Sequence, residues 1–231
     1  MTGEPPIRAL VVDYGGVLTV PIRFAFEAWL EADDIAPEAF GEVLAEWRAT
    51  PGNPMHLMET GELSADDFAD YLVGRLRRRD GGTVDAAGLH DRIFAALHVD
   101  PDAFVMLRAA RAAGLKTALL SNSWDFPYPW EQLDPLLDVK IVSGEVGLRK
   151  PDPAIYRLAG SQLGLPLTEC AFVDDIASNV EAAAALGMFA VLHTDLASTL
   201  AALSTRMPER VPHLPDPIEQ PIEQPIEQPG G

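Results

Sequence analysis

The chain has 231 residues, of which 48% are hydrophobic and 23% are charged, so it can bury one sizeable core and is neither fibrous nor disordered throughout. Its 17 basic and 35 acidic residues give a net charge of −18, which disfavours general binding to nucleic acid and docking on an anionic membrane. A single cysteine, no apolar run long enough to span a bilayer and no signal-peptide pattern predict a cytoplasmic protein.

The first predicted strand covers residues 7–12, a short and mostly apolar run. Asp13 follows it directly, and Gly15 and Gly16 end the extended pattern. A buried run of this length, bounded by glycines, is typical of a central strand in a parallel sheet.

Residues 21–97 carry apolar side chains at helical spacing and have no strand pattern. Ser64, with Asp67 three residues later, resembles a capping box, and the two glycines after Asp80 are expected to end the helix that it opens. The helices expected in this region cover residues 24–30, 37–49, 64–79 and 85–97. We interpret the region as a helical domain inserted into the main fold.

From residue 98 onward, predicted strands alternate with predicted helices, which implies parallel pairing through right-handed crossovers. The expected strands cover residues 115–120, 139–142, 170–173 and 189–192, and the expected helices cover 101–113, 152–163, 176–186 and 195–207. The sequence therefore predicts an α/β fold with a Rossmann-like, doubly wound parallel sheet. Residues 1–20 and 98–207 would form this core.

The last segment, residues 208–231, contains the tetrapeptide PIEQ three times. Proline at every fourth residue blocks a helix, and each repeat has one apolar residue to bury. We expect this segment to be a disordered or extended tail.

Polar side chains follow four of the predicted strands. They are Asp13, Ser121 with Asn122, Lys150, and Asp174 with Asp175. Because the carboxyl ends of parallel strands meet at one edge of a sheet, we expect these groups to lie together. Carboxylates, a hydroxyl and an ammonium can bind a divalent cation and a phosphate, and Mg²⁺ prefers oxygen ligands.

The segments around these residues resemble the four motifs of the haloacid dehalogenase (HAD) superfamily, over roughly residues 7–195. In chain order they read VVDYGGV, LLSN, GLRKPDP and FVDD, the last with Asn179 one helical turn later. The insert at residues 21–97 resembles the helical cap that covers the substrate in this family. The surroundings of Ser121 and Lys150 resemble the phosphatase-type domain that precedes epoxide hydrolases.

The resemblance implies a hydrolase, a Mg²⁺-dependent phosphatase that acts on a small phosphorylated metabolite through an aspartyl-phosphate. Asp13 would be the nucleophile. Ser121 and the backbone N–H of Asn122 would bind the phosphoryl group, and Lys150 would neutralise charge on it. We expect Arg149 to be a solvated neighbour of Lys150.

The resemblance also implies a magnesium site made by Asp13, the backbone carbonyl of Gly15 and Asp175, with Asp174 behind it or as an alternate ligand. Gly15 departs from the family pattern, since most phosphatases of this family have an aspartate there that protonates the leaving group. General acid–base help is worth about 10²–10⁴-fold. We therefore expect weak turnover on alkyl phosphates and a smaller loss on acyl or aryl phosphates.

Two other functions remain open. A metal-free 2-haloacid dehalogenase would use Asp13 to attack carbon, but the neighbouring Asp174 and Asp175 would repel both the nucleophile and an acid substrate. A non-catalytic protein that binds a phosphorylated ligand would explain Gly15. The sequence predicts neither the substrate nor the oligomeric state.

Overall fold

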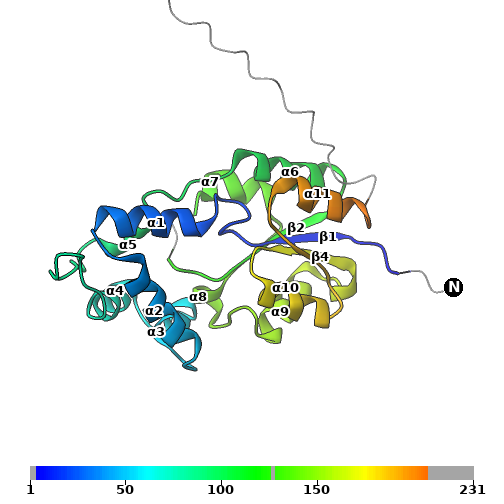
Figure 1. Cartoon of the computed structure of the whole chain (residues 1–231). Coiled ribbons are helices and arrows are strands. Elements are labelled where there is room, and N and C mark those ends of the chain that lie inside the picture. Colours follow the sequence, from blue (N-terminus) through cyan, green and yellow to red (C-terminus); the bar gives the residue numbers. More distant parts are fainter. Residues whose placement is uncertain (1–3, 126–127, 208–231) are drawn as a thin grey trace, which may run out of the picture.

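The computed structural model describes residues 4–125 and 128–207, in which five strands form one fully parallel sheet (Figure 1). The strands are β1 (Ala9–Val12), β2 (Lys116–Ser121), β3 (Val139–Val142), β4 (Cys170–Asp174) and β5 (Phe189–Leu192). Their order across the sheet is β3-β2-β1-β4-β5, so β1 is central as predicted. The tail predicted at 208–231 lies outside the described residues.

Helices cover both faces of the sheet, which confirms the doubly wound α/β fold (Figure 1). They are α6 (Pro101–Ala112) and α11 (Leu196–Ser204) on one face, and α9 (Pro153–Leu163) and α10 (Ala177–Ala185) on the other. Alternate strand residues point to opposite faces. Leu10 and Val12 pack in the cluster with α6 and α11, whereas Ala9 and Val11 pack in the cluster with α9 and α10. Burial on both sides explains why the strands are almost continuously apolar.

Five helices between β1 and α6 lie beyond the carboxyl ends of the strands (Figure 1), and we call them the helical segment. They are α1 (Ile22–Ala32), α2 (Pro37–Arg48), α3 (Pro54–Glu59), α4 (Ala65–Val73) and α5 (Leu89–Phe94). The chain enters and leaves the segment at one place, because Thr19 and Val99 form an antiparallel bridge. The core of the segment is continuous with one face of the sheet, since Trp29 and Leu72 belong to the same hydrophobic cluster as Leu10.

Two predicted helices in this segment are too long. The helix expected to reach residue 79 ends at Val73, with Gly74 at its C-cap. Beyond it, Arg78 forms an antiparallel bridge with Ile35, and the N–H of Arg79 donates to the carbonyl of Asp34 at 2.7 Å. These contacts satisfy the backbone outside a helix, which the local spacing could not indicate. The helix expected at 85–97 is the six-residue α5, because Gly88 precedes it in the left-handed conformation with a φ of 61°.

Several short helices were not predicted from the sequence. Apart from α3, they are α7 (Trp130–Leu133), α8 (Ser143–Val146) and the 3-10 turns η1 (Asp134–Leu136) and η2 (Leu167–Glu169). Helices of one turn leave no apolar periodicity for a sequence reading to detect. Within residues 4–125 and 128–207, no helix has the length and apolar character needed to cross a bilayer.

The predicted capping box of α4 can be tested by Ser64→Ala. The Ser64 hydroxyl accepts a hydrogen bond from the N–H of Asp67 at 3.1 Å and donates to the Asp67 carboxylate at 2.7 Å. Loss of this cap should lower the free energy of unfolding by about 1 kcal/mol in chemical denaturation. The control is Ser204→Ala, which removes a hydroxyl that donates to a carbonyl in the last turn of α11. Equal effects of the two substitutions would contradict the capping role.

Candidate active site

The sheet register brings the carboxyl ends of three strands to the same level. Val12 of β1 pairs with Leu119 of β2 on one side and with Val173 of β4 on the other. The N–H of Asp13 donates to the carbonyl of Val173 at 2.9 Å, so the pairing of β1 with β4 continues through Asp13. Asp174 is the last residue of β4, and its carboxylate therefore lies beside that of Asp13.

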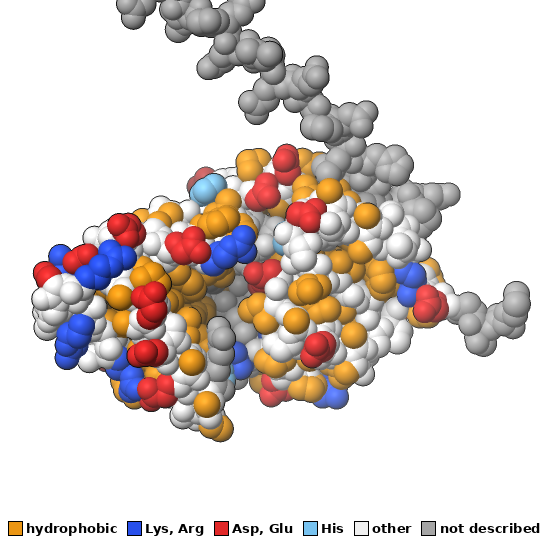
Figure 2. All heavy atoms as spheres, viewed as in Figure 1, with side chains coloured by type: hydrophobic (Ala, Val, Ile, Leu, Met, Phe, Trp, Pro, Cys, Tyr) orange, Lys and Arg blue, Asp and Glu red, His pale blue; other side chains and the backbone are white. Residues whose placement is uncertain are grey.

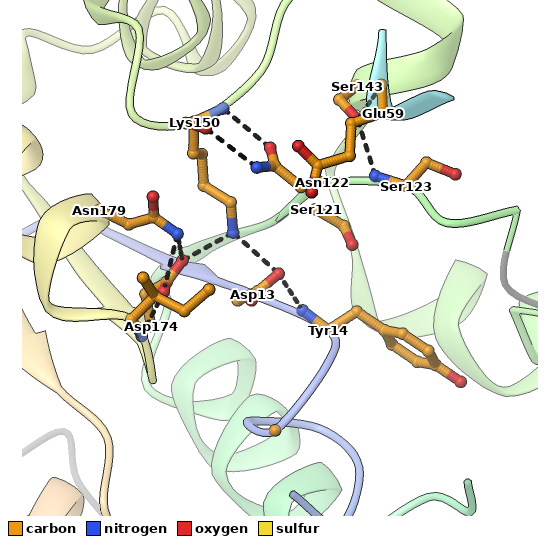
Figure 3. A network of polar contacts seen from close by, with 12 residues as sticks. Asp13, Tyr14, Glu59, Ser121, Asn122, Ser123, Ser143, Lys150, Asp174 and Asn179 are labelled. Carbon is orange, nitrogen blue, oxygen red and sulfur yellow. Dashed lines mark hydrogen bonds and ion pairs between the residues drawn. The ribbon is translucent and has the colours of Figure 1, made fainter. Parts of the chain in front are cut away.

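The ammonium of Lys150 lies between these two carboxylates (Figure 3). Its Nζ is 2.8 Å from Oδ1 of Asp13 and 2.6 Å from Oδ2 of Asp174, and Lys150 is 1% exposed. Asp174 also accepts hydrogen bonds from Nδ2 of Asn179 at 3.0 and 3.1 Å and from the N–H of Ile176 at 2.8 Å. Because a buried charge is tolerated only when it is paired, these contacts explain how the Lys150 ammonium and the Asp174 carboxylate can both be buried.

Three carboxylates could hold a metal ion at this edge of the sheet. Asp13, Asp174 and Asp175 each offer an oxygen, and the three atoms lie within 4.8 Å of one another. An all-oxygen set fits a hard divalent cation such as Mg²⁺. The backbone also makes room for this set, because a Cβ on Gly16, whose φ is +75°, would lie 2.3 Å from Oδ2 of Asp175. The carbonyl of Gly15, the other ligand suggested by the sequence, stays a prediction.

Burial and the repulsion of neighbouring carboxylates raise the pKa values of Asp13 and Asp175. Burial raises the pKa of Asp13 to about 7; the Lys150 cation opposes this rise, and Asp174 and Asp175 add to it. Burial, together with Asp174, raises the pKa of Asp175 to about 6. Burial alone would lower the pKa of Lys150, but Asp13 and Asp174 raise it above its ordinary value. A divalent cation would favour the ionised carboxylates over the protonated ones.

Ser121 ends β2 and is fully buried at the site. Its Oγ accepts a hydrogen bond from the hydroxyl of Tyr128 at 2.9 Å, which leaves the proton of Ser121 available to a bound oxygen. Burial raises the pKa of Tyr128 above its ordinary value, so the phenol stays protonated and can serve as this donor. Tyr128 lies outside the four motif segments, seven residues after Ser121.

Asn122 uses its side chain to fix the backbone of Lys150 (Figure 3). Its Oδ1 accepts from the N–H of Lys150 at 2.8 Å, and its Nδ2 donates to the carbonyl of Lys150 at 3.0 Å. These two bonds join the loop after β2 to the loop after α8. The backbone N–H of Asn122, which the sequence reading assigned to the phosphoryl group, remains a candidate donor.

Glu59 is a residue of this region that the sequence did not indicate. It ends α3, is 5% exposed, and has its Oε2 2.5 Å from Nε of Arg149 and its Oε1 3.0 Å from Nε1 of Trp124. The expectation that Arg149 is solvated is therefore wrong, because this buried carboxylate pairs with it. No sequence signal joins residues 59 and 149, since only the fold brings them together.

A hollow separates the helical segment from the sheet on the face drawn in Figure 2, with acidic and basic side chains along its rim. The strands point toward the helical segment in Figure 1, so the hollow lies at the carboxyl-end edge of the sheet. This is the edge of an open α/β sheet at which ligands bind.

Comparison with known proteins gives a family match over most of the chain. A sequence model of the family described as haloacid dehalogenase-like hydrolase matches residues 7–187. Acyl-CoA dehydrogenase family member 10 of Mus musculus is 30% identical over 82% of this chain and 18% of its own length. A phosphatase of Mycobacterium tuberculosis is 32% identical over 80% of this chain and 87% of its own length. Bifunctional epoxide hydrolase 2 of Sus scrofa is 26% identical over 84% of this chain and 38% of its own length.

This chain therefore spans less than half of the first and third relatives and most of the second. Among solved structures, a HAD family enzyme from Bacteroides thetaiotaomicron, in complex with magnesium and inorganic phosphate, matches with a TM-score of 0.61. The two chains are 21% identical, and the match covers 80% of this chain and 93% of the other. At this identity the comparison establishes a shared fold.

The raised carboxylate pKa values predict how stability depends on pH and Mg²⁺. The pKa of Asp13 is about 7 in the folded protein against an ordinary value of 3.8, so the folded state holds the extra proton between these values. Without divalent cation, the contribution of Asp13 to the stability of the folded state is fully present below about pH 4 and is lost as the pH rises through about 7. Added Mg²⁺ should therefore raise the Tm more at pH 8 than at pH 5.

Thermal denaturation at both pH values, with NaCl matching the ionic strength, measures this difference. Other groups also titrate, so the informative quantity is the Mg²⁺-induced rise in Tm of the wild type minus that of Asp13→Asn. That variant should lose the pH-dependent part of the Mg²⁺ effect. An equal Mg²⁺ effect at both pH values in the wild type would contradict a cation at these carboxylates.

Proposed function

We propose that this chain is a Mg²⁺-dependent phosphatase of small phosphorylated metabolites. The chain belongs to the haloacid dehalogenase-like hydrolases, and within that family its site best supports this reaction. The observation that carries the proposal is the Lys150 ammonium between Asp13 and Asp174, with the Asp175 carboxylate close enough to complete a cation site. The similarity to a phosphatase along 87% of that relative's length supports it.

In the proposed reaction, one carboxylate oxygen of Asp13 attacks phosphorus as the bond to the leaving oxygen breaks, and an aspartyl-phosphate forms. Water then attacks the same phosphorus, which releases inorganic phosphate and restores Asp13. Lys150 holds Oδ1 of Asp13 at 2.8 Å, and the N–H of Tyr14 donates to the same oxygen at 2.7 Å, so the nucleophile is fixed in orientation. The Ser121 hydroxyl donates to a phosphoryl oxygen, together with the N–H of Asn122.

The proposed magnesium ligands are Asp13, the Gly15 carbonyl and Asp175. Asp174 is the less available acid, because Lys150 and Asn179 already occupy its oxygens, whereas Asp175 is partly exposed. When bound there, Mg²⁺ would neutralise charge on the phosphoryl group. The solved enzyme of the same fold holds magnesium and inorganic phosphate, which is consistent with this ligand pair.

We also propose that residues 21–97 are a cap over the site and that residues 1–20 and 98–207 are the core. The helical segment lies beyond the carboxyl ends of the strands (Figure 1), and Asp13 directly follows the carboxyl end of β1. Its position leaves the hollow of Figure 2 as the place for the substrate. Specificity would then be set by cap residues, because the core supplies the chemistry that all substrates share.

Phosphate release from a panel of phosphorylated metabolites, with Mg²⁺ and with EDTA, tests the proposal. We expect release that needs Mg²⁺, and a loss of about 10³-fold or more in Asp13→Asn, because the nucleophile is gone. The matched control is Asp195→Asn, which changes an exposed helix-capping aspartate of α11 and should keep full activity. A folded wild type that releases no phosphate from any substrate would contradict the phosphatase.

The same preparation separates the two alternatives. Chloride release from 2-chloropropionate in EDTA would favour a metal-free dehalogenase, although the excess of carboxylates over cations at the site would repel such an acid. A phosphate-dependent thermal shift without turnover, unchanged in Asp13→Asn, would favour a binding protein.

Gly15→Asp tests the missing general acid. If an aspartate at this position can protonate the leaving group, kcat on alkyl phosphates should rise, with an upper range of about 10²–10⁴-fold. Acyl and aryl phosphates should gain less, because their leaving groups need no proton. Gly16→Asp is the matched control and should lose activity, since its Cβ would displace Asp175. No gain in Gly15→Asp would contradict this interpretation of Gly15.

A further inference from the structure

We propose that Glu59 of the helical segment is a positioning residue that holds the two phosphoryl-binding loops at their working separation. The inference rests on the proposed function. Glu59 lies outside all four motif segments, and its carboxylate binds Arg149 and Trp124, not the carboxylates of the site. Its carboxylate is nevertheless buried, with a side-chain exposure of 7%.

The two oxygens of this carboxylate bind different loops. Oε2 accepts from Nε of Arg149 at 2.5 Å, and Arg149 directly precedes Lys150. Oε1 accepts from Nε1 of Trp124 at 3.0 Å, and Trp124 lies two residues after Asn122. One side chain from α3 therefore links the loop that follows Ser121 and carries Asn122 to the loop that carries Lys150.

These two loops are also joined by the pair of bonds between the Asn122 side chain and the backbone of Lys150. A single attachment point lets two loops rotate about it, whereas a second one fixes their relative orientation. Glu59 supplies the second attachment through a charge-assisted hydrogen bond, which is stronger than a neutral one. The orientation matters because Ser121 and Lys150 must meet one phosphoryl group from different loops.

Glu59 is itself held in place, so it can act as a fixed support. Its carbonyl accepts from Oγ of Ser143 at 2.5 Å, and the same Oγ accepts from the N–H of Ser123 at 2.7 Å (Figure 3). Just beyond α3, a Cβ on Gly61 would lie 2.6 Å from the carbonyl of Gly144, so the two backbones are in close contact. The end of α3 thus packs directly on α8 and on the loop after β2.

Trp124 extends this link into the helical segment. Its ring centroid lies 5.8 Å from that of Phe26, 5.5 Å from that of Phe68 and 6.4 Å from that of Phe94. These residues belong to α1, α4 and α5. The position of the helical segment is therefore transmitted to Ser121 and Asn122 through Trp124, and to Lys150 through Arg149.

Glu59→Gln tests the inference, because it keeps the length and shape of the side chain and removes its charge. We expect the Kd for inorganic phosphate in the presence of Mg²⁺ to weaken about tenfold or more, the size of one lost charge-assisted bond. Amide hydrogen exchange at Ser123 and Lys150 should accelerate, because the N–H of each lies at a junction that Glu59 stabilises. KM should rise more than kcat falls.

Glu62→Gln is the matched control, since Glu62 follows α3, is exposed, and has a carboxylate that accepts a hydrogen bond from the nearby Thr60 hydroxyl. Both readouts should equal the wild type there. If Glu59→Gln lowers the Tm while the phosphate Kd and the exchange of both amides stay within twofold of the wild type, the contact is merely structural and the inference is overturned. Should that variant fail to fold, Arg149→Gln, which removes the partner charge, gives the same readouts.

The outcomes for the proposed function are separate. Wild-type turnover decides whether the protein is a phosphatase, whereas the ratio of variant to wild-type phosphate affinity decides the role of Glu59. Amide exchange needs no substrate. Unchanged exchange together with an unchanged phosphate Kd therefore overturns the inference even where turnover is found, and accelerated exchange with weakened phosphate binding supports it even where turnover is absent.

Discussion

The buried ammonium of Lys150 is the interaction on which the site depends. It lies between Asp13 and Asp174, two carboxylates that the parallel register places side by side and that would otherwise repel each other. Burial pushes the pKa of Asp13 upward, and the lysine limits that rise. When Asp13, Asp174 and Asp175 are all ionised, the single Lys150 cation leaves two negative charges over, and a divalent cation would neutralise them. Fold, protonation and ligand preference are therefore parts of one electrostatic arrangement.

Support for this arrangement comes from two directions. From the sheet side, strand pairing fixes Asp13 and Asp174, and Asn179 and the N–H of Ile176 hold the second carboxylate. From the opposite side, the helical segment reaches the loops through Glu59. Lys150 is held from both directions, because its side chain contacts Asp174 of the sheet and its backbone is bound by Asn122 of the loop after β2.

Local sequence signals allowed much of the fold to be predicted. The predictions failed where a contact between residues far apart in the chain sets the end of a helix or the environment of a side chain. Strands β3 and β5 have the predicted bounds, because each is a short apolar run between polar turns. The four polar features were predicted to converge because parallel strands share an edge, and the carboxylate cluster confirms that convergence for Asp13, Asp174 and Asp175.

The end of α4, by contrast, is decided by the bridge between Ile35 and Arg78, and the environment of Arg149 by a carboxylate 90 residues earlier in the chain. Such pairs leave no periodicity or composition in the sequence. The side-chain role of Asn122 was hidden for the same reason, since its partner is the backbone of a loop 28 residues later.

The hydrophobic cluster that runs from the sheet into the helical segment has a thermodynamic consequence. Trp29 and Leu72 share this cluster with Leu107 and Leu119, so the helices cannot melt without exposing apolar surface of the α/β layers. Heat should then denature both parts in one cooperative transition, with equal calorimetric and van't Hoff enthalpies, and not in two separate steps.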